Sequence, residues 1–197
     1  SLLHQIEGLK VAVYQSYGMT ETVSHVALRW LNGSEGKQAY VILPRVNAGV
    51  DERGCLYVSG PMTLGQRIQT NDLVEFVGPD KFNWLGRIDN VINSGGVKII
   101  LDRVDDRLAH LFHQLGLNFQ FFTWFEEDKK LGQKLILVIN ANEGNTSSEW
   151  LISEIRKSIS SYETPKHIYF VNRFEKTQTD KTDKHRTVEM ILKNIHG

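Results

Sequence analysis

The chain has 197 residues, and 23 lysine and arginine residues balance 23 aspartate and glutamate residues, so its formal net charge at pH 7 is zero. This length allows one large domain or two modest ones. The charges are balanced and scattered, so the sequence has no basic patch of the kind that binds a nucleic acid, and we expect no nucleic-acid partner. No apolar run is long enough to cross a membrane, so we also expect no membrane span. Because the single cysteine, Cys55, cannot form an internal disulfide, we expect a cytoplasmic protein.

Short β-strands separated by turns are predicted in the first half of the chain. The candidate strands are residues 10–14, 39–43, 55–59, 72–77 and 82–85. The segments between them, including residues 47–49, contain the Gly, Pro, Asn and Asp residues that favour tight turns. We therefore predict an antiparallel, β-rich region with a barrel-like sheet.

Strands and amphipathic helices alternate in the second half, after a boundary near residues 86–89. The first helix has apolar residues at helical spacing, namely Val104, Leu108, Leu111, Phe112 and Leu115. Strands are predicted at residues 117–125, 134–139 and 166–171. The fold class is therefore α+β, and the second half is a small domain with a central three-stranded sheet and a β-hairpin.

Two further helices complete this second half. Thr146 and Glu149 form a capping-box pattern, which predicts the start of one helix. Its inward face would contain Leu151, Ile152, Ile155 and Ile159. The inward face of the last helix would contain Val188, Ile191, Leu192 and Ile195.

Common catalytic signatures are mostly absent. The sequence lacks a Gly-x-Ser-x-Gly nucleophile elbow, a Gly-Lys-Ser/Thr phosphate loop and a His-Glu-x-x-His motif. His110 and His113 could share a helix face as metal ligands, but their spacing implies no further ligand, so we interpret them as partly exposed helix residues. Cys55 lies in an apolar run and is interpreted as a buried structural thiol.

Two polar segments of the first half could bind a nucleotide. In residues 17–21 (Tyr-Gly-Met-Thr-Glu), a ring and a glycine would let a base stack near the backbone, while a hydroxyl and a carboxylate suit a phosphate and Mg²⁺. In residues 70–72 (Thr-Asn-Asp), the carboxylate could accept both hydroxyls of a ribose. Taken alone, the first segment is equally typical of a turn with a helix cap, and the second of an Asx turn.

Two further segments follow the first half. In residues 86–98 (Gly-Arg-Ile-Asp-Asn-Val-Ile-Asn-Ser-Gly-Gly-Val-Lys), Arg87 offers a fork of donors for phosphate or ribose oxygens, and the paired glycines would let a ligand approach bare backbone. Simple hairpin chemistry explains the glycines as well. Residues 176–184 (Lys-Thr-Gln-Thr-Asp-Lys-Thr-Asp-Lys) form a polar loop, either merely solvated or able to deliver a lysine to a phosphate.

In order and spacing, the four segments resemble the adenylate-forming superfamily: acyl-CoA synthetases, luciferases and the adenylation domains of peptide synthetases. Residues 86–98 most resemble the o-succinylbenzoate-CoA ligases of menaquinone biosynthesis. The resemblance implies that residues 1–87 are the C-terminal part of the large domain and that residues 88–197 are the small mobile domain. It also implies a ligase whose partners are a small carboxylic acid, ATP and CoA, with Mg²⁺.

The resemblance assigns nucleotide roles to the first half. Tyr17 would stack on adenine with Gly18 beside it, Thr20 would meet the phosphates, and Glu21 would hold Mg²⁺. Asp72 would bind the ribose hydroxyls.

The resemblance also assigns roles around and beyond the boundary. Arg87 would contact the nucleotide, and Asp89 would be the hinge about which the small domain swings between half-reactions. The pantetheine tunnel would be lined by Ser94, Gly95 and Gly96. Lys181 would be the adenylation lysine, which bridges the acid and the α-phosphate.

Three residues depart from the family pattern. Asn71 and Asp180 stand where the family usually has glycine, and Glu175 stands where it usually has proline. Asn71 is a mild change because asparagine also tolerates positive φ. Asp180 places a negative charge beside Lys181 that the common motif lacks.

Nothing in this sequence corresponds to the N-terminal phosphate loop or to most of the acyl pocket of the family. We therefore expect the 197-residue chain alone to be a fragment without catalytic activity. The alternatives are a ligase for another aryl or fatty acid, an adenylation domain that loads a carrier protein, and a non-catalytic relative that binds a ligand or partner.

Overall fold

The computed structural model describes residues 6, 8–32, 39–141 and 147–196. The chain divides into two compact units, Ser1–Asp89 and Asn90–Gly197, and the division falls directly after Asp89. No helix among the described residues has the length and apolar character needed to cross a membrane.

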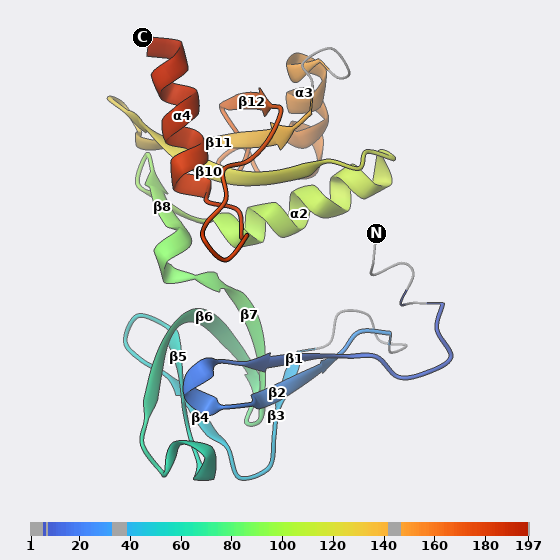
Figure 1. Ribbon diagram of the computed structural model, residues 1–197, viewed down its shortest axis with the longest axis vertical. Coiled ribbons are helices and arrows are strands. Elements are labelled where there is room, and N and C mark those ends of the chain that lie inside the picture. Colours follow the sequence, from blue (N-terminus) through green and yellow to red (C-terminus); the bar gives the residue numbers. More distant parts are fainter. Residues whose placement is uncertain (1–5, 7, 33–38, 142–146, 197) are drawn as a thin grey trace. The chain divides into compact units, whose positions relative to one another are not determined.

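The first unit is a seven-stranded antiparallel sheet with the order β1-β2-β3-β7-β6-β5-β4 (Figure 1). Its strands are β1 (Tyr14–Gly18), β2 (His25–Trp30), β3 (Tyr40–Ile42), β4 (Asn47–Val50), β5 (Cys55–Ser59), β6 (Ile68–Gly78) and β7 (Lys81–Arg87). Short 3-10 turns lie at Thr20–Thr22, Pro61–Thr63 and Ile88–Asn90. The core of this unit contains Val26, Ala27, Tyr40, Leu56, Val58, Val74 and Phe82.

The strand boundaries differ from the predictions at three places. The first strand was predicted at residues 10–14, but β1 begins at Tyr14 and ends at Gly18. Tyr17 and Gly18 therefore lie on the strand itself. β6 begins at Ile68, so residues 70–72 lie within a strand, in which Asp72 pairs with Arg87. β4 and β2 are additional strands, and residues 47–49 pair with β5 although their Asn, Ala and Gly favour a turn. At residues 47–49, sheet pairing overrides the local preference for a turn.

The second unit is a three-layer α+β domain. A hairpin, β8 (Val91–Ser94) and β9 (Val97–Ile100), leads into α2 (Leu101–Gln114). The central strands are β10 (Gln120–Asp128), β11 (Gly132–Asn140) and β12 (His167–Val171); β11 pairs antiparallel with β10 and parallel with β12. The remaining helices are α3 (Ser148–Ser158) and α4 (Lys184–His196). The predicted fold class, including the three central strands and the hairpin, is confirmed.

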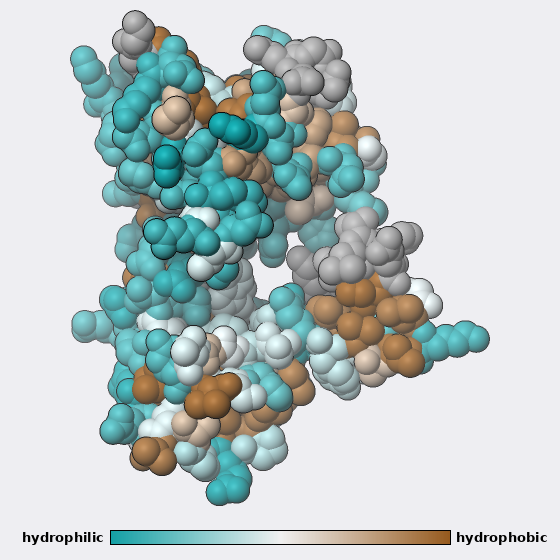
Figure 2. Space-filling model, in the orientation of Figure 1, coloured by the Kyte–Doolittle hydropathy of each residue, from teal (hydrophilic) through white to brown (hydrophobic). Residues whose placement is uncertain are grey.

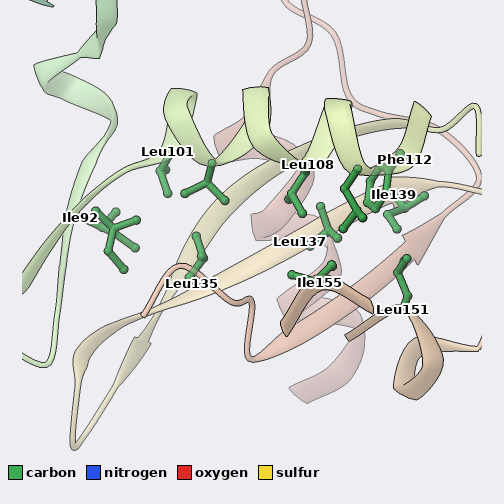
Figure 3. Packing of buried hydrophobic residues seen from close by; sticks show 12 residues of the cluster. Ile92, Leu101, Leu108, Phe112, Leu135, Leu137, Ile139, Leu151 and Ile155 are labelled. Carbon is green, nitrogen blue, oxygen red and sulfur yellow. The ribbon is translucent and has the colours of Figure 1, made fainter. Parts of the chain in front are cut away.

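Alternation along β11 explains the layers. Leu135, Leu137 and Ile139 face the cluster formed with α2 and α3, as Figure 3 shows, while Ile136 and Val138 pack with Val188 of α4. A strand sends successive side chains to opposite faces, so a strand buried on both faces is a continuous apolar run.

Helix details also correct the predictions. The cap of α3 is Ser147, whose Oγ accepts a hydrogen bond from the backbone N–H of Trp150 at 3.3 Å. Thr146, the predicted cap, lies outside the described residues. On α4, Ile195 is exposed and does not belong to the inward face that was predicted.

Candidate functional site

Tyr17 and Asp72 meet in the first unit although 55 residues separate them in the sequence. The Tyr17 hydroxyl donates a hydrogen bond to Oδ2 of Asp72 at 2.5 Å. The ring of Tyr17 also makes edge contacts with Tyr40 and Phe82. Burial, together with the Asp72 carboxylate, holds the pKa of Tyr17 above its usual range, so this hydroxyl remains a donor.

The Asp72 carboxylate has further partners on its neighbouring strand. Trp84 Nε1 donates to Oδ1 at 3.3 Å, and Nη1 of Arg87, directly opposite Asp72 in the register, lies 4.0 Å from Oδ1. The backbone N–H of Asp72 donates to Thr70 Oγ1 at 3.0 Å. The side chain is 16% exposed, so it can still be reached by a ligand.

A second carboxylate lies at the end of the first unit. Asp89 Oδ2 accepts hydrogen bonds from Arg87 Nη2 at 3.0 Å and from Asn71 Nδ2 at 3.2 Å. The Arg87 guanidinium, with a smaller contribution from Asn71, lowers the pKa of Asp89, although desolvation opposes this shift. Arg87 thus lies between the two carboxylates of this site.

The turn after β1 is fixed by its backbone. A Cβ at Gly18 would lie 2.6 Å from the Ser24 carbonyl oxygen and 2.8 Å from the Cα of His25, so this bulge requires glycine. Thr22 is fully buried, and its hydroxyl lies within hydrogen-bond distance of two carbonyl oxygens, those of Met19 and Ser24.

Thr20 and Glu21, on the same turn, are exposed. One exposed carboxylate fits a Mg²⁺ ion that is held mainly by nucleotide phosphates and water. It does not form a cage made by the protein alone, and no group of three or more possible metal ligands occurs in the described part of the chain.

The paired glycines of the second unit make a tight hairpin. Ser94 pairs with Val97, and both residues of the two-residue turn have positive φ, 60° at Gly95 and 84° at Gly96. A primed turn requires this conformation, which glycine adopts without a steric penalty. Gly95 N–H donates to the Leu131 carbonyl at 2.9 Å, so the hairpin is attached to the β10–β11 turn.

Lys181 lies on an exposed loop closed by short-range backbone bonds. An isolated β-bridge joins Lys176 and Thr182. Between them, the Thr177 N–H donates to the Lys181 carbonyl at 2.8 Å, and the Lys181 N–H donates to Thr177 Oγ1 at 3.2 Å. Figure 2 shows mainly hydrophilic residues over this loop and the visible face of α4.

The loop runs directly into a buried anchor. Lys184, the first residue of α4, pairs with Asp105 of α2 at 3.0 Å, and each side chain is about one-quarter exposed. Asp105 Oδ1 also accepts the Thr123 N–H at 2.6 Å. The base of the loop is therefore fixed to the sheet and to α2.

The chain is similar to known proteins, although no family model matches it. It is 26% identical, over its whole length, to a 2-succinylbenzoate–CoA ligase of Geobacillus sp. (strain WCH70), of which it covers 44%. It is 57% identical, over 96% of its length, to an acyl-CoA synthetase (AMP-forming)/AMP-acid ligase II-like protein from Dyadobacter fermentans DSM 18053 (TM-score 0.52), of which it covers 54%. These matches confirm the resemblance to the adenylate-forming superfamily.

A second solved structure shares the fold of the chain. The structure of O-succinylbenzoate coenzyme A synthetase from Bacillus subtilis with ATP and magnesium ion aligns with 95% of the chain (20% identity, TM-score 0.76), which covers 43% of that structure. The chain thus spans less than half the length of the curated relative and of this structure.

The departures from the adenylate-forming pattern have local explanations in the structure. Asp180 has a φ of 60°, a left-handed conformation that glycine adopts freely and that aspartate tolerates better than most residues. Asn71 lies in extended β6, so positive φ is not the reason for its presence; its amide instead binds Asp89. Glu175 forms an ion pair with Arg186 at 3.6 Å, at the base of the Lys181 loop.

Two contacts of the site carried no sequence signal. Trp84 and Asn71 contact Asp72 and Asp89, and only the strand register reveals these contacts. The interpretation of Cys55 as a buried thiol is confirmed, since it is fully buried and burial raises its pKa. His110 and His113 are exposed on α2 and, within the described residues, join no metal-ligand group.

Proposed function

We propose that the chain contributes the ribose-binding carboxylate, the hinge and the adenylation lysine of an ATP-dependent carboxylic acid–CoA ligase. The contact between Tyr17 and Asp72 carries this proposal, because it joins the residues expected at the adenine and at the ribose. The division of the chain after Asp89 supports a hinge there. The comparisons support the same class of enzyme.

The reaction needs positive charge at the α-phosphate. A carboxylate oxygen of the acid attacks the α-phosphorus of ATP, and pyrophosphate leaves with the bonding electrons. Both reactants are anionic, so we assign Lys181 to neutralise the charge that grows in the transition state. Mg²⁺, held in part by Glu21, would supply further positive charge at the phosphates, and Thr20 would donate its hydroxyl to them.

The second half-reaction consumes the acyl-AMP. The CoA thiolate attacks the acyl carbonyl, a thioester forms, and AMP leaves. We assign Ser94, Gly95 and Gly96 to the path of the CoA arm, because a glycine turn leaves the backbone accessible. Rotation about Asp89 would exchange this hairpin for Lys181 between the two steps.

For the acyl substrate we propose o-succinylbenzoate, which would place the enzyme in menaquinone biosynthesis in the cytoplasm. Support comes from residues 86–98 and from the match to 2-succinylbenzoate–CoA ligase, at 26% identity. Other aryl or fatty acids and carrier-protein loading are the competing substrate classes.

The test uses the complete gene product that contains this chain. Pyrophosphate release and acyl-hydroxamate formation are measured across a panel of acids, with Asp72→Ala in parallel. We expect turnover of o-succinylbenzoate and a raised KM for ATP in the variant. Turnover of a different acid alone would contradict the substrate assignment, and no turnover of any acid would favour a non-catalytic relative. The 197-residue chain alone is expected to form no acyl-AMP.

A further inference from the structure

Both oxygens of the Asp72 carboxylate are held by aromatic donors. The Tyr17 hydroxyl of β1 binds Oδ2 at 2.5 Å, and Trp84 Nε1 of β7 binds Oδ1 at 3.3 Å. The terminal torsion of an aspartate has a broad, roughly two-fold energy profile, so its orientation is set by its partners. The two rings therefore determine the plane in which this carboxylate lies.

The two donors also determine which acceptor positions remain. An ionised carboxylate has about four lone-pair positions, of which the two rings use one on each oxygen. Arg87 Nη1, at 4.0 Å from Oδ1, is close enough for attraction but beyond hydrogen-bond distance. About one acceptor position per oxygen is left, which matches two hydroxyl donors on adjacent carbons.

We propose that Trp84 is a positioning residue for ribose recognition. By orienting the Asp72 carboxylate, Trp84 sets the discrimination between ribonucleotides and deoxyribonucleotides. The inference rests on the proposed function, in which Asp72 binds the ribose of ATP. Trp84 donates its indole N–H to Oδ1 and so fixes the direction of the lone pair that remains on this oxygen. When one ribose hydroxyl binds Oδ2, the adjacent hydroxyl can then bind Oδ1. Trp84 is 36% exposed, so a ligand can lie beside its ring.

The removal of this N–H should weaken hydroxyl recognition more than it weakens nucleotide binding in general. The complete gene product and its Trp84→Phe variant are assayed for adenylation with ATP, 2′-deoxy-ATP and 3′-deoxy-ATP. In the unmodified enzyme, we expect ATP to be favoured over each deoxynucleotide by about tenfold or more. In the variant, kcat/KM for ATP should fall about five- to tenfold because KM rises, and kcat/KM for the two deoxynucleotides should fall less.

The matched control is Trp30→Phe. Trp30 lies in the same unit and donates its indole N–H to Asn32 Oδ1 at 2.9 Å, so the same chemical change is made away from Asp72. We expect this variant to discriminate among the nucleotides as the unmodified enzyme does. Benzothienylalanine at position 84, which keeps the ring shape but replaces N–H with sulfur, gives the same test if Trp84→Phe fails to fold.

The outcomes separate the inference from the proposed function. An equal loss for all three nucleotides, or unchanged discrimination, would overturn the role of Trp84 while the ligase activity stands. If the unmodified enzyme adenylates no acid, the proposed function fails, and calorimetric titration with ATP then shows whether any ribose site exists. Reduced discrimination at unchanged kcat supports Trp84 as the residue that orients Asp72.

Discussion

The Asp72 site and the Lys181 loop are held in opposite ways. Side-chain bonds from two other strands, β1 and β7, hold Asp72, whereas the loop is closed by bonds within residues 175–183, such as the two between Thr177 and Lys181. Asp72 is largely buried, while Lys181 is exposed. A group that recognises a ligand benefits from preorganisation, and a group that must arrive and leave benefits from few contacts. The contrast therefore separates recognition from charge delivery.

The strongest test of this contrast is Lys181→Ala in the complete gene product. If Lys181 neutralises negative charge that grows at the α-phosphate in the transition state, kcat for adenylation should fall about 100- to 1000-fold with little change in the KM for ATP. Pyrophosphate release under saturating acid measures this.

Lys193→Ala is the matched control, since Lys193 is an exposed lysine of α4 that pairs with Glu189. It should retain full activity. Adenylation by Lys181→Ala at the normal rate would remove this lysine from the mechanism.

The next test perturbs the Asp72 site through the backbone of the β1–β2 bulge. In Gly18→Ala, the new Cβ would lie 2.6 Å from the Ser24 carbonyl oxygen, so the β1–β2 bulge must shift. We expect a loss of about 1–3 kcal/mol in the free energy of unfolding, and weaker ATP binding as Tyr17 moves from Asp72. Urea unfolding and calorimetry measure the two effects.

Gly78→Ala is the control, because a Cβ there meets only Lys81 Cβ, at 3.8 Å, an ordinary contact. Equal stability of the two variants would show that the bulge adapts and that the site does not depend on it.

The sequence predicted the helices of the second unit better than the strands around Asp72. Apolar periodicity identified α2 and α4 because a buried helix face leaves a direct trace in the spacing of residues. The composition of residues 70–72 predicts a turn because Thr, Asn and Asp favour turns, but these residues lie within β6, and Asp72 pairs with Arg87 of β7.

Individual motif residues were found, whereas two of the side chains that contact them, Trp84 and Asn71, were given no such role. Asp72 stood out by its place before an apolar strand, yet Trp84 and Asn71 act only through register and side-chain direction. Such contacts depend on the register between β6 and β7 and on which face each side chain occupies, and local composition carries no signal for either.

A third test asks how much the Lys184–Asp105 ion pair at the base of the loop contributes to stability. Lys184→Met removes the partner of Asp105, and we expect a loss of about 1–2 kcal/mol, reduced from the cost of a fully buried pair because each side chain is one-quarter exposed. Burial raises the pKa of Asp105, although Lys184 opposes this. A raised pKa gives stability at low pH that is lost as pH rises, so the cost of the substitution should grow from about pH 4 to neutrality.

Urea unfolding across this pH range, with Lys157→Met as control, checks the expectation. Lys157 forms an exposed pair with Glu154, which should contribute much less. A cost for Lys184→Met that is independent of pH would mean that Asp105 is not the group that responds.

The smallest expected effect concerns the Asp89 carboxylate, where the rigid site meets the proposed hinge. Arg87 is the largest cause of its lowered pKa and Asn71 a smaller one. In an NMR titration, Arg87→Gln should raise the pKa of Asp89 towards its ordinary value, and Asn71→Ala should raise it less. Because Asp89 is more than half exposed, neither change should measurably alter stability through this carboxylate. The reverse order would mean that the amide of Asn71, not the guanidinium, fixes Asp89, and the hinge would then be tied to β6 instead of β7.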